Sequence, residues 1–131
     1  MNKTTEVKIA IVREYQGQAN GFDDHYSTPL HHFTYSTGVK LVADTCGAHW
    51  LIDAIASHQP NGSGLRDQDF QAWFLAYSKP SDDWILRCED GNENVLIEQE
   101  IEFSDFPKDL AEGHGFRLWL ENNVLFLPEE R

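Results

Sequence analysis

The sequence has little positive charge. Its 131 residues contain 10 lysines and arginines against 22 aspartates and glutamates, which gives a formal net charge of -12. A protein that binds nucleic acid through its phosphates needs a basic surface, so this composition argues against direct nucleic-acid binding. Long apolar runs are also missing: no stretch reaches the roughly 18 residues of a membrane span, and Met1–Glu6 does not begin a signal peptide. We therefore expect a cytoplasmic protein that does not contact a membrane.

Cysteine is scarce as well, with only Cys46 and Cys88 in the chain. Without a secretory signal we expect both thiols to be reduced, and the lack of paired Cys-x-x-Cys motifs argues against a zinc knuckle. Phosphate loops, dinucleotide fingerprints, nucleophile elbows and His-Glu-x-x-His helices are missing too. The sequence thus predicts no cofactor and disfavours an enzyme.

The apolar content is ordinary, at 40%, and 12% of the residues are aromatic. One domain of this length can build a core from it, so we expect a single domain over residues 1–131, with 1–30 as a more variable N-terminal segment. The charge is unevenly placed: residues 1–65 carry a net -2 and residues 66–131 carry -10. This asymmetry indicates an acidic surface formed by the second half of the chain.

Periodicity in the first half predicts three elements. Alternating Val7, Ile9 and Ile11 indicate a strand, and the β-rich runs 32–35 and 39–43 indicate a hairpin. A helix capped by Asp44 or Thr45 is expected over about 45–58.

The second half reads as successive strands over residues 70–77, 84–89, 95–103, 116–121 and 124–127. A two-residue turn near Asp90–Asn92 would pair Leu86 with Val95 or Ile97, and in either case Val95 and Ile97 would point inward. The predicted fold is therefore α+β: an antiparallel sheet of about five to seven strands with one main helix packed on it.

Three groups of side chains could carry chemistry. The first is Cys46, His49 and Asp53, whose i+3 and i+4 spacings bring them to one helix face. They could form a nucleophilic triad or bind zinc; alternatively, His49 and Asp53 are an ordinary pair on an exposed helix.

The second group is a histidine-rich loop over residues 23–32. Asp24, His25, His31 and His32 could bind a metal ion, although neighbouring residues in an extended segment point apart. The alternative is a polar loop without a metal.

The third group is acidic. Glu98, Glu100 and Glu102 point to one side of a predicted strand, and Glu89 and Asp90 lie close in sequence. Such a row is either screened by solvent, as on a charged edge strand, or used to bind a basic partner.

Five blocks of the sequence resemble a family of small bacterial, plasmid and phage proteins of unknown function. They are TGVK (37–40), GAHWLIDAIA (47–56), CEDGN (88–92), IEFSDFP (101–107) and LWLENNVLFLP (118–128). In the N-terminal third only Phe22 and Tyr26 fit. The resemblance implies a fold and a setting in mobile elements, but no activity. The family pattern usually has tyrosine where this chain has His49, which argues against a catalytic role for that histidine.

Three functions follow as hypotheses. We expect a non-enzymatic, acidic interaction protein, encoded by a mobile element, that binds a basic surface of a nucleic-acid-handling or defence protein. The alternative is a small metal-dependent or Cys/His enzyme that uses Cys46, His49 and Asp53 or the histidine-rich loop. A third is a homodimer anchored by an exposed Trp50 or Trp119.

Overall fold

The computed structural model describes residues 4–21, 24–27, 33–59, 65, 68–102 and 104–131. They form one seven-stranded sheet with the strand order β1-β2-β7-β6-β3-β4-β5. The strands are β1 (His25–Tyr26), β2 (Thr34–Ser36), β3 (Phe70–Ser78), β4 (Asp83–Glu89), β5 (Val95–Ile101), β6 (Phe116–Glu121) and β7 (Val124–Phe126). The helices are α1 (Thr5–Gln18), α2 (Thr37–Cys46), α3 (His49–Ser57), α4 (Lys108–Ala111) and the short 3-10 helix η2 (Pro128–Glu130).

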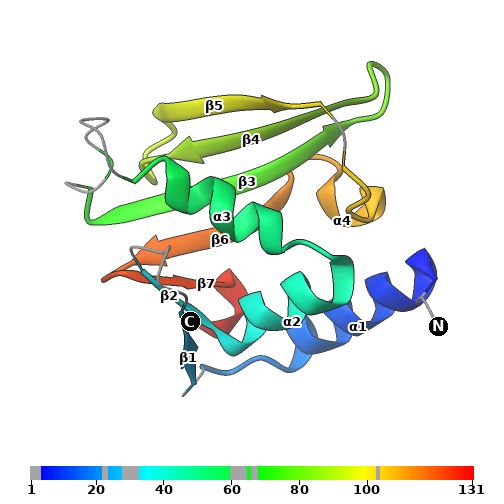
Figure 1. The fold of residues 1–131 in the computed structure, drawn as a ribbon, viewed down its shortest axis with the longest axis horizontal. Coiled ribbons are helices and arrows are strands. Elements are labelled where there is room, and N and C mark those ends of the chain that lie inside the picture. The colour runs from blue at the N-terminus through cyan, green and yellow to red at the C-terminus, as the bar shows by residue number, and fades with distance from the viewer. Residues whose placement is uncertain (1–3, 22–23, 28–32, 60–64, 66–67, 103) are drawn as a thin grey trace.

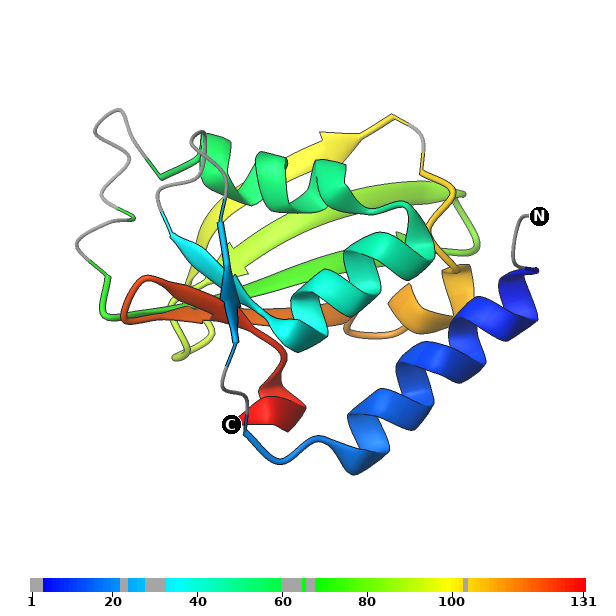
Figure 2. The same cartoon turned by 60° about the horizontal axis from the view of Figure 1, so that its bottom comes forward.

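The α+β class is confirmed, and the sheet is antiparallel except where β2 and β7 pair in parallel. Helices α2 and α3 lie on one face of the sheet, with α1 beyond α2 (Figure 1). The second view shows η2 between β7 and α1 (Figure 2). Among the described residues, no helix has the length and apolar character needed to cross a membrane.

The strand predicted at residues 7–12 is wrong, because this segment lies inside helix α1. The Thr4 hydroxyl accepts a hydrogen bond from the Val7 amide and caps the helix. Val12 is fully buried, whereas Val7 is 46% exposed, so burial does not follow the alternating apolar pattern. Packing of one helix face has overridden the β preference of valine and isoleucine.

The hairpin predicted over residues 32–43 is wrong, whereas the helix predicted over about 45–58 is confirmed as α3 but begins only at His49. The Ser36 hydroxyl accepts from the Val39 amide and starts α2 at Thr37, where a second strand was expected. Gly47 then adopts a left-handed conformation (φ 62°), which ends α2, and α3 begins at His49. Glycine suits this position because it lacks the Cβ atom that disfavours a positive φ in other residues.

The strands of the second half are confirmed, with β3 in the centre between β4 and β6. The register predicted for β4 and β5 is wrong: Leu86 lies opposite Gln99, and the pairing shifts between Cys88 and Glu89. Ile97 still faces the helices, but Val95 is 53% exposed, so its predicted inward orientation is wrong. Because the register shifts there, the inward–outward alternation predicted for β5 does not reach Val95.

The core lies between the sheet and the helices. It contains Trp73, Leu75, Leu86 and Leu118 from the sheet, packed with residues of α2 and α3 such as Ile52 and Ile55. The opposite face of the sheet, which we call the open face, is not covered by α2 or α3 (Figure 1). At its β6 end, Arg131 lies over the Trp119 ring, and Arg13 and Glu129 line a pocket with Arg117. The side chains of the open face come from alternate positions: Phe70, Ala72, Phe74, Ala76, Ile85, Arg87, Glu89, Val95, Glu98, Glu100, Arg117 and Trp119.

Candidate functional site

Strand β5 forms one end of the sheet, and of the described strands only β4 pairs with it. Glu98 and Glu100 are exposed and alternate along this strand with partly buried residues. Glu102 is also exposed, just beyond the end of the strand. Within the described part of the chain, none of these three carboxylates has a hydrogen-bond or ion-pair partner. We call these three residues the acidic edge.

Asp83 belongs with the acidic edge, although its charge gave no specific signal in the sequence. It is exposed at the start of β4, next to β5 in the sheet. Together with Glu100 and Glu102 it lines a shallow hollow of about 150 Å³, whose floor includes Trp84 and Ile85. A cationic side chain entering this hollow would meet three carboxylates beside an apolar surface.

Glu89 and Asp90 are engaged inside the chain. The Glu89 carboxylate lies 2.9 Å from the Nε atom of Arg87, and both side chains are largely buried. Asp90 accepts hydrogen bonds from the backbone amides of Asn92 (2.7 Å) and Asn94 (3.2 Å) and from the Asn94 side chain (2.9 Å). These bonds, above all the one from the Asn94 side chain, lower the pKa of Asp90. Asp90 therefore shapes the β4–β5 turn.

The structure does not bring Cys46, His49 and Asp53 together. Cys46 ends α2 and is 1% exposed, whereas His49 and Asp53 lie on α3, beyond the break at Gly47. Burial raises the pKa of the Cys46 thiol to about 11, so the thiol keeps its proton near neutral pH. Burial likewise raises the pKa of Cys88 to about 12. Neither cysteine is an activated nucleophile.

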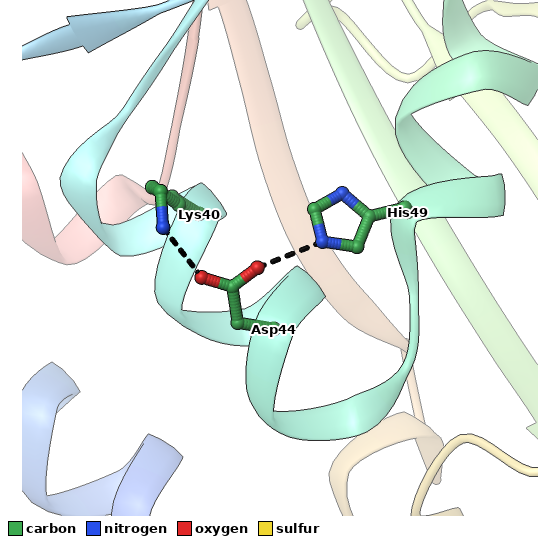
Figure 3. A network of polar contacts seen from close by, with 3 residues as sticks. All are labelled: Lys40, Asp44 and His49. Atoms are coloured by element: carbon green, nitrogen blue, oxygen red, sulfur yellow. Dashed lines mark hydrogen bonds and ion pairs between the residues drawn. The ribbon is translucent and has the colours of Figure 1, made fainter.

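His49 instead pairs with Asp44, a contact between the two helices (Figure 3). Its Nε2 atom lies 2.8 Å from one oxygen of the Asp44 carboxylate, and the Nζ atom of Lys40 lies 2.6 Å from the other. The hydrogen bond from Lys40, followed by that from His49, holds the pKa of Asp44 below its usual range. The side chains of His49 and Asp44 are 57% and 46% exposed, so this is a surface pair that joins α2 to α3.

Of the histidine-rich loop, the structure describes Asp24 and His25. Asp24 is exposed, and the Nδ1 atom of His25 lies 3.2 Å from the Thr34 hydroxyl across the β1–β2 pair. His31 and His32 lie outside the described residues, so the four-residue metal site remains a prediction. Elsewhere in the described chain, no group of three His, Cys, Asp or Glu side chains is arranged to hold a metal ion.

Glu130 lies in the charged segment Glu129–Arg131, so no sequence pattern indicates that it is buried. Its carboxylate is fully buried and accepts four hydrogen bonds. One oxygen accepts from the Ser36 hydroxyl (2.5 Å) and the Leu127 amide (2.8 Å); the other accepts from the Tyr15 hydroxyl (2.8 Å) and the Gly38 amide (2.9 Å). Burial, and then this contact, raise the pKa of Tyr15.

The negative charge of Glu130 lies at the N-terminus of α2, where the helix dipole and free amides favour an anion. A Cβ atom at Gly38 would lie 2.6 Å from the Glu130 carboxyl carbon, so only glycine admits the carboxylate there. Four donors surround its two oxygens, and we assign Glu130 a structural role that ties α1, α2 and η2 together.

A second buried polar group lies under α3. The side-chain amides of Gln59 and Gln71 exchange two hydrogen bonds of 3.0 Å, and the Trp73 indole donates to Gln71 at 2.9 Å. The two amides line a hollow of about 190 Å³ together with Phe33 and Asp69. Because the amides bond to each other and to backbone oxygens, this group fixes the core and offers no free catalytic atom.

The model of a family described as a family of unknown function (DUF6876) matches residues 12–131. No curated protein matches the chain, and neither does any solved structure.

Proposed function

The chain belongs to DUF6876, a family of unknown function, and we propose that it is a non-enzymatic interaction protein that binds a basic partner through its acidic edge. The observation that carries this proposal is the alignment of Glu98, Glu100 and Glu102, all exposed, along the outer strand of the sheet. In the setting of a mobile element, the partner would be a basic cytoplasmic protein that handles nucleic acid or takes part in defence.

The spacing of the carboxylates supports a cationic partner. Residues two apart on a strand are about 6.8 Å apart, so neighbouring carboxylates repel each other by about 0.6 kcal/mol in water. Arg87 lies opposite Glu98 on the neighbouring strand, but its guanidinium pairs with Glu89. The repulsion along the acidic edge is therefore relieved mainly by salt or by a partner's lysines and arginines. Binding of such a partner should therefore be fast at low salt and weaken as salt rises.

Two further features suit a binding surface. The outward edge of β5 leaves backbone groups free for a partner strand or side chain, as in complexes that extend a sheet. The hollow formed by Asp83, Glu100 and Glu102 beside Ile85 would take the apolar stem of a lysine or arginine while its charge meets the carboxylates. Glu89 and Asp90 contribute less, because their charges are engaged within the chain.

The test is a triple charge reversal, Glu98→Lys, Glu100→Lys and Glu102→Lys. Immobilised wild type and variant would be incubated with host lysate at about 0.05 M and about 0.5 M salt, where screening differs strongly. A control would carry the same change of charge on the helical side of the molecule, at the exposed residues Glu6, Glu14 and Glu129.

We expect a basic protein that wild type and control capture at low salt, that high salt elutes, and that the triple variant does not retain. Capture that is equal for the triple variant and wild type would refute the acidic edge as the binding site. Equal loss in both variants would show that only total charge matters.

A further inference from the structure

On the open face, residues that lie opposite one another on neighbouring strands form rows across the sheet. One row, read across β6, β3, β4 and β5, consists of Arg117, Phe74, Arg87 and Glu98, so it has a positive charge at one end and a negative charge at the other. Arg87 lies over the Phe74 ring at 5.3 Å from the centroid and pairs with Glu89. Within the described chain, Arg117 and Glu98 have no charged partner. They are three strands, about 14 Å, apart and so do not pair with each other.

In the next row, the two ends differ in shape as the ends of the first row differ in charge. It reads Trp119, Ala72, Glu89 and Val95 across the same four strands. At the β5 end, Val95 is 53% exposed, the larger value of the two exposed large apolar residues that the structure describes. A hollow of about 340 Å³ extends from β6 across β3 and β4, lined by the apolar residues Phe70, Ala72, Phe74 and Trp119 and by charged residues that include Arg87, Glu89 and Arg117. One end of the row therefore projects an apolar side chain, and the rest of the row borders a hollow with a mixed apolar and charged lining.

These two rows are complementary to themselves. A two-fold axis above the open face, parallel to the strands and midway between β3 and β4, exchanges β6 with β5 and β3 with β4 of a second copy. It places Arg117 over the partner's Glu98, and Phe74 over the partner's Arg87. It also places Val95 over the hollow beside the partner's Trp119, and Ala76 over the partner's Ile85 in the third row.

We propose that the open face is the interface of a symmetric dimer of this chain. Two sheets would pack face to face about 10 Å apart, as in a β-sandwich, through the same patch on each copy. Each unpaired end of the charged row then meets an opposite charge, and the exposed Val95 meets the aromatic side of the hollow, at Trp119. This inference does not rest on the proposed function: Glu98 is shared between the two surfaces, whereas Glu100 and Glu102 stay at the rim, facing a basic partner.

The net charge of -12 on each copy opposes association, but the interface itself is balanced. In these two rows each copy carries two arginines, Arg87 and Arg117, and two carboxylates, Glu89 and Glu98. Arg117 faces the partner's Glu98 across the axis, whereas Arg87 pairs with Glu89 of its own chain. At about 0.15 M salt the screening length is about 8 Å, so distant repulsion fades while direct pairs persist. The four strands cover on the order of 400 Å² per copy, below the roughly 800 Å² of a standard interface. The dimer should therefore be weak and depend on protein concentration.

The test is a charge swap followed by sedimentation equilibrium from low micromolar to several hundred micromolar protein, at about 0.15 M salt. Arg117→Glu and Glu98→Arg each place like charges against each other across the axis, so each should weaken the dimer at least tenfold. The double variant restores opposite charges and should recover the dimer. Lys8→Glu is the control, because this residue of α1 undergoes a comparable reversal of charge and does not line the pocket that contains Arg117.

Circular dichroism and thermal unfolding would show that each variant is folded before it is sedimented. A wild-type chain that stays monomeric at the highest concentration would overturn the proposal. So would a double variant that remains as weak as the single variants, or a control that weakens the dimer as much as Arg117→Glu does. A dimer unaffected by both reversals would place the interface elsewhere. Loss of dimer in Arg117→Glu with capture of a basic partner unchanged would separate this interface from the acidic edge.

Discussion

Replacement of the buried Glu130 by glutamine tests the contact that joins the two ends of the chain. Glutamine keeps the size of the side chain but turns one acceptor oxygen into an NH₂ group. Each carboxylate oxygen of Glu130 accepts one backbone amide, from Leu127 or from Gly38, and one hydroxyl, from Ser36 or Tyr15. Whichever way the amide is turned, one buried backbone N–H group then faces another donor.

The magnitude follows from these contacts. A hydrogen bond to a charged group contributes about 1.5–3 kcal/mol, and a buried donor left without a partner costs about 1–3 kcal/mol. The hydroxyls can rotate to new partners, but the backbone amides are fixed. We therefore expect Glu130→Gln to lower the free energy of unfolding by about 3–5 kcal/mol, a large share of the 5–15 kcal/mol of a typical domain.

Urea unfolding at pH 7, followed by tryptophan fluorescence, measures this change. The matched control is Glu129→Gln, since Glu129 is exposed and accepts one long hydrogen bond (3.2 Å) from Gln16. The control should change the free energy of unfolding by less than about 0.5 kcal/mol. A loss of less than about 1 kcal/mol in Glu130→Gln would refute the reasoning, because four donors on one buried carboxylate cannot then contribute as assigned.

Two further predictions concern titrating groups. Because burial raises the pKa of Cys46 to about 11 and that of Cys88 to about 12, the unfolded chain loses its thiol protons first as pH rises. Stability should be nearly unaffected below about pH 8 and should fall by about 1.5–2 kcal/mol per thiol by pH 10; urea unfolding of the double alanine variant in reductant should lack this slope. Asp44 has a lowered pKa, so its small stabilising effect is present above about pH 4 and is lost in acid. Since its side chain is 46% exposed, Asp44→Asn should shift the free energy of unfolding by less than about 1 kcal/mol at pH 7, and a larger loss in thermal unfolding would contradict a surface role.

The parts of the fold that could be predicted are those in which local pattern and tertiary environment agree. The successive strands from β3 onward have alternating or continuous apolar residues separated by clear turns, such as Asn122–Asn123, where both residues have positive φ (55° and 61°). The acidic row was predictable because a period of two alone places Glu98 and Glu100 on one side of a strand.

The first half was mispredicted because its local signals conflict with its packing. Val7, Ile9 and Ile11 favour a strand, yet α1 forms because a Thr4 cap and the burial of Val12 favour a helix. Gly38 resembles a hairpin turn in the sequence, but in the structure it makes room for Glu130 inside α2. That reason lies 92 residues away and leaves no local trace.

The contacts of the candidate site residues were also mispredicted, because they depend on packing that the local sequence pattern does not specify. The expected grouping of Cys46 with His49 and Asp53 assumed one continuous helix, and the Gly47 break separates Cys46 from the other two. The same break lets His49 reach back to Asp44 at the end of α2. The pairing of Arg87 with Glu89, which takes Glu89 out of the acidic surface, depends on side-chain geometry that a strand pattern does not specify.

The parallel pairing of β2 with β7 also has a kinetic consequence. It joins Thr34 to Val124, and the nearby bond from Ser36 to Glu130 spans 94 residues. Contacts of such long range form only after a large loop has closed, which costs chain entropy before any contact repays it. The β3–β4–β5 meander, built from near neighbours, can form first. Docking of the N-terminal helices onto the sheet then becomes the late, rate-limiting event, and the slow step of folding lies where the two ends of the chain meet.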